Sequence, residues 1–588
     1  MLRQYALPFA MVAVASLISS ADETVPSFVM FTDPVITLPQ PFRDLPPGQL
    51  ALWRQVLARP EVEYQRLAAE AIGHVHRLGI PGMEAARPEL RRVLTDPKAD
   101  PTAVRSAALT LIALDTRDSA AELFEVSRRG GSDIRAVIEP ALAEWDHQPM
   151  RTVWRDRLAN SATPRRDLLL AAKGLATVRD AEALPALLNI VHSSARTADI
   201  RLACARAAGE LSETGLAADA ARMIQGTAPS LGQRLCAVAL LARQSDDDAR
   251  QLLARLAEDV EPAVAAAALG RLYAIDPALV LPLVEGALRS RAAEVRDWAA
   301  RALIALPTPE RIVTLADLLD DPHPDVRGRV RAELFVLAQQ AQLDPAIRES
   351  AMRVVERESW RGQEQAGLLL AALDHEPAAP RLVALLESPR PEVMIAAAWG
   401  LRRLAVPETI PALLDKAQRQ SDVQLAQTAQ NVSAVDQQVA HLFEALALMR
   451  HEPVVPLLRK YVPKNFVLGE LSRSAAIWSL GVLLKGRPDD ALAGQLMERV
   501  RDLGGPGPIP PELELVRRMS AIGIGHMQAR SQLPAVREFL GPTVEADDTE
   551  FALRWTLKEL SGEELPLPPP IARTEGRWFL TPLSKPAP

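Results

Sequence analysis

Arginines recur at one position of a repeated helical pattern, and they are the first residues in this chain that could do chemistry. Each directly follows the anchor, the first core position of its repeat, and together they are Arg105, Arg135, Arg201, Arg296, Arg327, Arg473 and Arg517. Such a row could hold an acidic ligand, because Arg donates paired hydrogen bonds to carboxylates. The alternative is a structural ladder in which each Arg bonds carbonyl or carboxylate groups of the preceding turn, with Asp96 and Asp321 as acceptors. We favour the ladder, because a residue repeated in unit after unit is expected to serve the stack.

Four tryptophans are the candidate binding residues. Trp399, Trp478 and Trp555 each lie six residues after an anchor, and Trp578 lies in the C-terminal tail. The first three could form an aromatic stripe for a peptide or glycan, since aromatic residues dominate interface hot spots. The alternative, which we favour, is that these rings pack against the adjoining helix.

The two cysteines, Cys204 and Cys236, occupy the same core position in neighbouring repeats. Stacked helices lie about 8 to 10 Å apart, whereas a disulfide needs Cα atoms within about 7 Å. The sequence therefore predicts buried free thiols rather than a bridge.

No motif for catalysis or metal binding stands out. His74 and His76 are two residues apart on a predicted helix, so they point in different directions, and no HExxH pattern completes a site. Gly523-Ile-Gly525 follows no predicted strand, so close helix packing explains it better than a phosphate loop. We predict no catalytic, cofactor-binding or metal-binding residue, and no enzyme activity.

The elements that carry these residues are repeated helices. In Leu318 to Ala338, the apolar Val326, Val330, Leu334 and Leu337 fall on one helical face. The pattern returns after 31 residues in its best copies, and it gives 15 anchors: Tyr64, Val104, Ile134, Asp167, Ile200, Gly232, Val264, Val295, Val326, Gly362, Val393, Gln438, Ser472, Val516 and Thr549. A fixed period in the low thirties is typical of an α-solenoid.

A second helix of each unit is marked by an opening proline, as at Pro185, Pro282, Pro380, Pro411 and Pro456. Proline suits the first turn of a helix, whose N–H groups have no intrahelical partner. We expect successive second helices to form the face that binds a partner. The regular stack is expected to be interrupted near residues 415–440 and 503–511, where the sequence is Gln-rich or reads LGGPGPIPP.

Three stretches carry a family resemblance: DPHPDVRGRVRAEL, AAEVRDWAARAL and DPTAVRSAALTL. Together with the 31-residue step they resemble HEAT repeats, and the short period is similar to the PBS-lyase HEAT-like form. The resemblance covers about residues 50 to 560. It implies an all-α fold, a right-handed α-α superhelix of about 15 helical pairs, used mostly as a binding scaffold.

The first 21 residues have the pattern of a bacterial-type signal peptide. Arg3 provides the positive charge, Ala6 to Ile18 the apolar stretch, and Ser19-Ser20-Ala21 a small-residue cleavage site. We expect cleavage after Ala21 and export to the periplasm or medium, without an integral membrane span; the alternatives are an uncleaved tether and a buried N-terminal helix.

Proline-rich segments flank the predicted solenoid at residues 22–49 and 561–588. Proline removes backbone donors and restricts its neighbours, so both segments are expected to be extended. The first is expected to lie as a strap on the first helices or to be a loose terminus. The second is expected to dock on the last repeat, through Trp578, or to be exposed.

The net charge of −7, with acids and bases interspersed, gives no basic stripe for nucleic acid. We therefore predict an exported, non-catalytic scaffold for an unidentified protein partner, without cofactor. One alternative is a self-associating structural component of the cell envelope. Another, by analogy with the phycobilin lyases that share the short repeat, is a lyase or lyase accessory.

Overall fold

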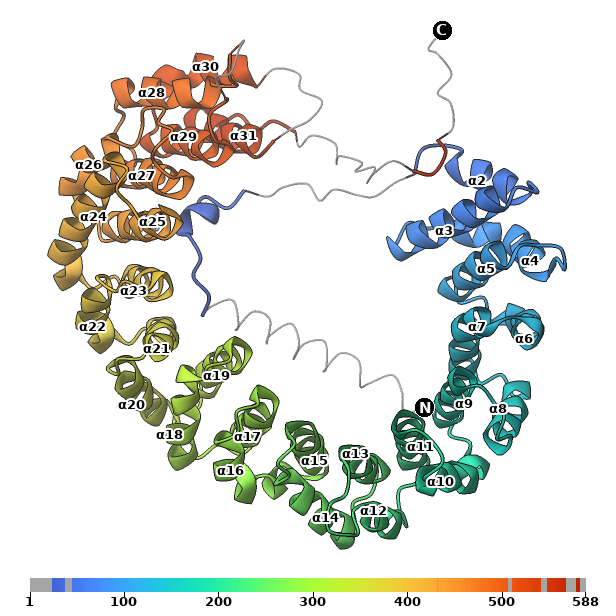
Figure 1. Ribbon diagram of the computed structural model, residues 1–588. Coiled ribbons are helices and arrows are strands. Elements are labelled where there is room, and N and C mark those ends of the chain that lie inside the picture. Colours follow the sequence, from blue (N-terminus) through green and yellow to red (C-terminus); the bar gives the residue numbers. More distant parts are fainter. Residues whose placement is uncertain are drawn as a thin grey trace. The chain divides into compact units, whose positions relative to one another are not determined.

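The computed structural model describes residues 24–36, 45–430, 432–505, 510–540, 547–566 and 578–581; the predicted signal peptide lies outside them. Within these ranges the secondary structure consists of α-helices and short 3-10 helices, without a strand (Figure 1). This confirms the all-α prediction.

The helices alternate between two layers. All 15 anchors lie in the odd-numbered helices, which are α3 (Val62–Arg77), α5 (Pro101–Ala113), α7 (Ser132–Glu144), α9 (Arg165–Thr177), α11 (Ala198–Leu211), α13 (Leu231–Leu240), α15 (Pro262–Ile275), α17 (Ala293–Ala305), α19 (Pro324–Leu337), α21 (Trp360–Ala372), α23 (Pro391–Leu404), α25 (Val432–Leu448), α27 (Glu470–Leu483), α29 (Glu514–Met527) and α31 (Asp548–Ser561).

The even-numbered helices are shorter on average and form the other layer. They are α2 (Gln49–Leu57), α4 (Arg87–Thr95), α6 (Ala120–Arg129), α8 (Pro149–Ala159), α10 (Leu184–His192), α12 (Ala217–Met223), α14 (Asp247–Ala257), α16 (Val284–Leu288), α18 (Pro309–Asp317), α20 (Asp344–Val355), α22 (Ala379–Leu385), α24 (Ile410–Leu425), α26 (Val455–Arg459), α28 (Asp490–Arg501) and α30 (Leu533–Phe539). Four of the five marked prolines open one of these helices, and Pro282 lies in the 3-10 turn before α16.

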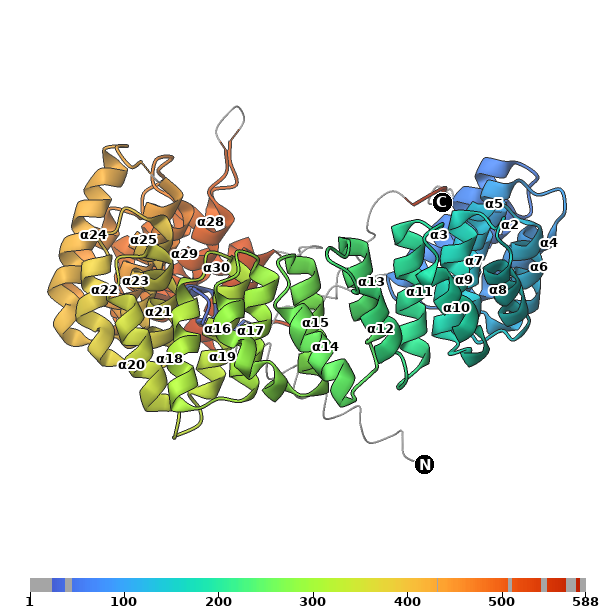
Figure 2. The ribbon, with the colours of Figure 1, turned by 60° about the horizontal axis from the view of Figure 1, so that its bottom comes forward.

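The chain divides into two compact units. Unit 1 comprises residues 1–39 and 303–569, and unit 2 comprises residues 40–302 and 570–588. Within each unit, odd-numbered helices pack side by side, as α3, α5, α7 and α9 do in unit 2 and α21, α23, α25 and α27 do in unit 1, and most even-numbered helices pack on the helix that follows them in the chain (Figures 1 and 2). Each unit therefore contains residues from both ends of the sequence.

The core follows the pattern found in the sequence. Val326, Val330 and Leu334 are buried in α19, against neighbouring helices. Small residues let the odd-numbered helices approach closely: a Cβ at Gly525 would lie 2.5 Å from Trp555. This confirms helix packing, and not a phosphate loop, as the reason for Gly523-Ile-Gly525.

Candidate binding surfaces

The repeated arginines form a ladder on backbone carbonyl groups. Six of the seven donate to a backbone carbonyl that lies earlier in the chain, in the turn before the helix or at the end of the preceding helix. The pairs are Arg135 with Gly130, Arg201 with Val191, Arg296 with Ser290, Arg327 with Pro322, Arg473 with Pro463 and Arg517 with Val500, over 2.6 to 3.3 Å. Asp321 contributes its backbone oxygen, 3.4 Å from Arg327 Nη1, whereas the Asp96 carboxylate accepts from the backbone of Lys98. The structural ladder is thus confirmed for these six, while the exposed Arg105 has no such bond within the described residues.

The candidate tryptophans on helices are core side chains. Trp399 and Trp478 are each 1% exposed. The ring of Trp555 is partly buried, with its centroid 5.2 Å from that of His526. Trp399 and Trp555 lie as the packing alternative expects, whereas the Trp478 Nε1–H also donates to Asp33 near the N-terminus, and the three rings leave no free aromatic stripe on the described part of unit 1.

A segment near the N-terminus, which we call the strap (residues 24–36) and which contains the 3-10 helix Val29–Phe31, lies against α25 and α27 of unit 1, beside α25 in Figure 1. Its Met30 is fully buried, and the Met30 N–H donates to Glu444 Oε1 over 2.9 Å. The ring of Phe28 stacks on His441, with centroids 4.1 Å apart. The sequence analysis placed this segment on the first helices or left it as a loose terminus. The structure places it on α25 instead, because the buried Glu444 of α25 accepts from the Met30 N–H.

The second half of the strap is held by polar side chains of α27 and α29. Trp478 Nε1 donates to both the carbonyl and the Oδ2 of Asp33, at 3.1 and 3.0 Å. His526 Nε2 lies 3.6 Å from the same carboxylate. The hydrogen bond to His526 lowers the pKa of Asp33, and partial burial opposes this shift. Coulomb attraction to His526, the hydrogen bond from Trp478 and the charge of Lys485 lower the pKa further.

Buried charges support this surface from behind. Glu444 is fully buried, and its Oε2 accepts from Arg402 Nη1 at 2.6 Å. His441 is also buried, and burial lowers its pKa, so the ring beneath Phe28 is neutral near pH 7. Since Glu444 is already paired, the Met30 N–H meets a carboxylate whose position is fixed.

Replacing Asp33 by Ala is expected to loosen the strap, because Trp478 and His526 both lose their partner. Hydrogen exchange at the Met30 amide should speed up about tenfold, which corresponds to a charge-assisted bond of about 1.5 kcal/mol. The control Thr32→Ala removes a hydroxyl that bonds only Val29 within the strap, so it should leave this protection intact. Unchanged protection in Asp33→Ala would contradict the proposed contacts.

The same carboxylate makes docking pH-dependent. Because the pKa of docked Asp33 is lower than that of the free group, its contribution is present above about pH 4 and is lost as the pH falls through the docked value. Asp33→Ala should abolish this acid sensitivity.

The C-terminal segment docks on unit 2. Trp53 Nε1 donates to the Phe579 carbonyl, and Gln49 Nε2 to the Leu580 carbonyl, both at 2.5 Å. The ring of Trp578 lies 6.2 Å from that of Trp53. In Figure 1 the described C-terminal segment, residues 578–581, is the short red stretch beside α2. The sequence predicted docking on the last repeat or exposure, and the structure corrects it to the first helical pair, where Trp53 and Gln49 provide the donors.

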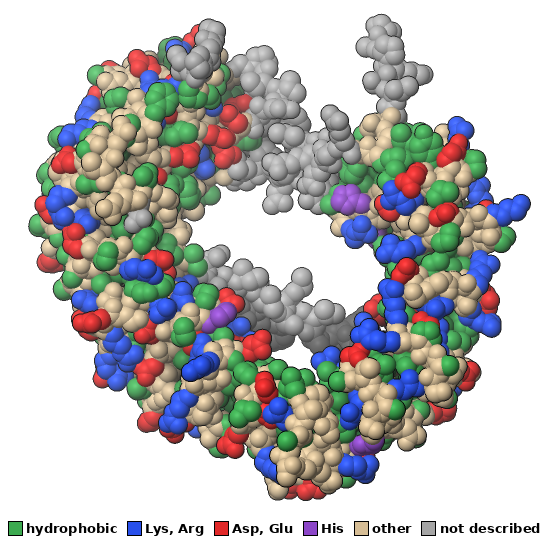
Figure 3. Space-filling model, in the orientation of Figure 1, with side chains coloured by type: hydrophobic (Ala, Val, Ile, Leu, Met, Phe, Trp, Pro, Cys, Tyr) green, Lys and Arg blue, Asp and Glu red, His purple; other side chains and the backbone are tan. Residues whose placement is uncertain are grey.

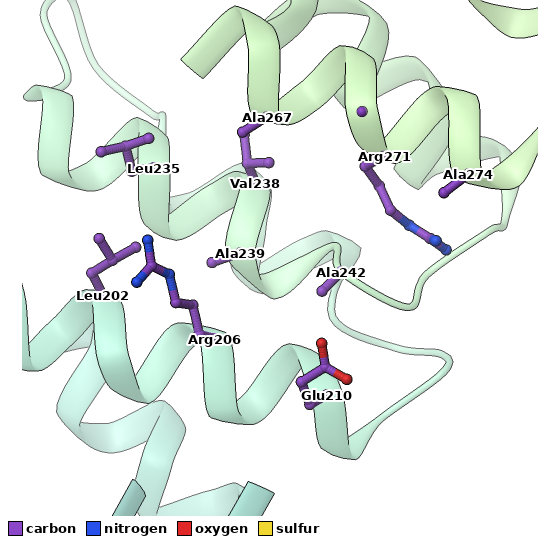
Figure 4. Close-up of a pocket in the computed structure, with 11 residues that line it drawn as sticks. Leu202, Arg206, Glu210, Leu235, Val238, Ala239, Ala242, Ala267, Arg271 and Ala274 are labelled. Carbon is purple, nitrogen blue, oxygen red and sulfur yellow. The ribbon is translucent and has the colours of Figure 1, made fainter. Parts of the chain in front are cut away.

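Unit 2 also has a shallow hollow of about 330 Å³ between α11, α13 and α15 (Figure 4). Leu202, Leu235 and Val238 line it, with Arg206 and Glu210 from α11. Arg271, across the hollow, donates to the carbonyls of Leu241 and Gln244. This guanidinium therefore ties two repeats together and does not face a ligand.

The described part of the chain has few other groups that could react or bind a ligand. Cys204 and Cys236 are free and buried as predicted, and burial raises the pKa of both, that of Cys204 to about 12. No cluster of potential metal ligands occurs among the described residues. No helix within them is long and apolar enough to cross a membrane. Basic and acidic side chains are interspersed over the face seen in Figure 3.

Two layers of paired helices with an arginine ladder define an α-solenoid protein. The family model described as HEAT repeats matches residues 249–334 and 349–433, so this part of the α-solenoid consists of HEAT repeats. No curated protein matches it in sequence.

Solved structures with a similar fold include Kap95p, which is yeast importin-β. One Kap95p structure, whose title says that Kap95p binding induces the GTP-bound conformation of the RanGDP switch loops, is similar to this chain. The two align with 14% identity over 87% of this chain and 72% of that chain, with a TM-score of 0.52. The Kap95:Nup1 complex aligns with 14% identity over 87% and 73%, with a TM-score of 0.50. At this identity the likeness concerns the fold alone.

Proposed function

We propose that this chain is an exported, non-catalytic scaffold that binds an extended segment of a partner protein on the odd-numbered helices of unit 1. The observation that carries the proposal is the strap. A short stretch of polypeptide, extended at Phe28 and coiled into a 3-10 helix at Met30, already lies on this surface, held by Glu444, Trp478 and the stacked ring of His441.

These contacts are of the kind that recognise a peptide. Glu444 accepts from a backbone N–H, which any residue except proline can provide. The Asp33 contacts of Trp478 and the Phe28 contact of His441 depend on side chains, so they would select sequence. A partner segment with the same spacing could replace the strap.

The comparisons support the general class. HEAT solenoids are used as protein-interaction scaffolds, and the two Kap95p structures are titled for complexes with RanGDP and Nup1. Neither partner is transferred to this chain. The proposed surface differs from the sequence prediction, since the odd-numbered helices, and not the proline-opened ones, hold the extended segment.

Export rests on residues 1–21, whose charge, apolar stretch and small residues fit a signal peptide. Mass spectrometry of the native protein should find Asp22 as the first residue. A native protein that still begins with residue 1 or 2 would contradict cleavage.

Cross-linking in native envelopes tests the binding surface. Lys485 follows α27 and interacts with Asp33 of the strap, while Lys460 follows α26 in the other layer; both are exposed. We expect partner cross-links from Lys485 and few from Lys460. Cross-links concentrated at Lys460 would overturn the assignment, and links only between copies of this chain would favour the self-associating alternative.

A further inference from the structure

Three arginines surround one tryptophan where α19, α21 and α23 of unit 1 begin. The guanidinium carbons of Arg390, Arg361 and Arg327 lie 4.2, 5.0 and 5.6 Å from the ring centre of Trp360. Trp360 is the first residue of α21, and Arg390 is the N-cap of α23. The three cations thus come from three successive repeats and meet at one ring.

These cations have few anionic partners in the described structure. Arg361 makes no hydrogen bond or ion pair with a described residue, although its guanidinium lies over the ring. Arg390 has Glu392 at 3.9 Å, and its side chain remains 47% exposed. Arg327 bonds two backbone oxygens at 3.3 and 3.4 Å, and its buried Nε has no acceptor.

A fourth arginine, Arg331, lies one turn after Arg327 on α19 and adds further positive charge. Arg331 donates to the neutral amide oxygen of Gln365 at 2.6 Å, and its Nε also lacks an acceptor. Burial lowers the pKa of Arg331. Attraction to Glu364 raises this pKa, and repulsion from Arg327 lowers it further. Glu364 attracts Arg331 and Glu392 lies near Arg390, whereas the nearby carboxylate of Asp320 accepts from the Ser359 hydroxyl and the Gly362 N–H.

The surroundings increase the positive potential. The N-terminal ends of α19 and α23 lie close to the cluster and carry partial positive charge, whereas the N-terminal end of α21 is already capped by the Asp320 carboxylate, which accepts from the Gly362 N–H. Arg361 is partly exposed to solvent. An incoming anion would gain charge-assisted hydrogen bonds that no described group supplies.

We propose that the Trp360 cluster, formed by Arg327, Arg361 and Arg390 around Trp360, binds the carboxylates of an acidic peptide segment. Guanidinium forks match carboxylates in shape. A peptide is favoured over nucleic acid, because the chain is acidic overall and the cluster is local, without a basic stripe leading to it. The proposal goes beyond the scaffold function and needs neither export nor release of the strap.

The test is binding of fluorescein-labelled hexaglutamate to the full chain, followed by anisotropy at about 50 mM salt, where surface charges are weakly screened. Arg361→Gln combined with Arg390→Gln should weaken binding about tenfold or more. The matched control is Arg301→Gln, which removes an arginine stacked on Trp298 at 5.0 Å but paired with Asp297. That variant should bind hexaglutamate as the unchanged protein does.

Stability separates binding from a structural role. Arg361→Gln alone should weaken binding while lowering the melting temperature no more than Arg301→Gln does, since the described partner of the Arg361 guanidinium is the Trp360 ring alone. A protein that does not bind hexaglutamate, or an equal loss in Arg301→Gln, would overturn the proposal. A phosphoserine peptide that binds tenfold more tightly than hexaglutamate would assign the cluster to phosphate and overturn the carboxylate assignment.

Discussion

Glu444→Ala is expected to destabilise unit 1 by about 3 to 5 kcal/mol and to release the strap. The variant leaves the guanidinium of Arg402, which is 6% exposed, buried without its carboxylate. A buried charge without its partner costs far more than the net worth of an ion pair. The same change removes the acceptor of the Met30 N–H, so strap and core should loosen together.

Hydrogen exchange followed by mass spectrometry can resolve this effect along the chain. Protection should fall in the strap and in α23 and α25, and remain unchanged in α5 and α7 of unit 2, because contacts in a solenoid are local. Glu444→Gln is the matched control: its single amide oxygen can accept from either Arg402 or the Met30 N–H but not from both, so it should cost about half as much. If Glu444→Ala leaves α25 as protected as before, Arg402 is not held by Glu444.

Gly209→Ala is expected to destabilise unit 2 by roughly 3 kcal/mol, toward the upper end of the usual cost of overpacking. A Cβ on Gly209 would lie 2.0 Å from the carbonyl oxygen of Ala239 in α13. The obstacle is backbone, which cannot rotate away as a side chain can. The helix α11 would have to move off α13, and this cost outweighs the gain of about 1 kcal/mol from replacing a helical glycine.

Gly286→Ala provides the control in the same unit. It lies within α16, and an added Cβ there meets no atom within 4 Å. Chemical denaturation should show a loss for Gly209→Ala and a neutral or stabilising effect for Gly286→Ala. Equal effects of the two substitutions would mean that α11 and α13 do not approach as closely as described.

Much of the fold could be predicted because its contacts are local in sequence. Val326, Val330 and Leu334 repeat with the helical period, and each copy packs on the next, so the stack follows from one pattern. The arginine ladder was predictable for the same reason: Arg135 and Arg327 reach carbonyls only five residues away. Of the residues that bind the strap, the sequence marked only Trp478, by its place six residues after an anchor, because nothing in the pattern distinguishes Glu444 and His526 from other polar residues of the helices.

The sequence by itself determined the all-α solenoid, its anchors and the buried free thiols, since these depend on spacing within one or two repeats. Only the tertiary structure decided that residues 24–36 dock on α25 and α27, and residues 578–581 on α2. The Met30 N–H and Glu444 are separated by 414 positions, and Trp53 and Phe579 by 526. No local rule links such residues; their pairing depends on which buried acceptor or donor the fold leaves available to an extended segment.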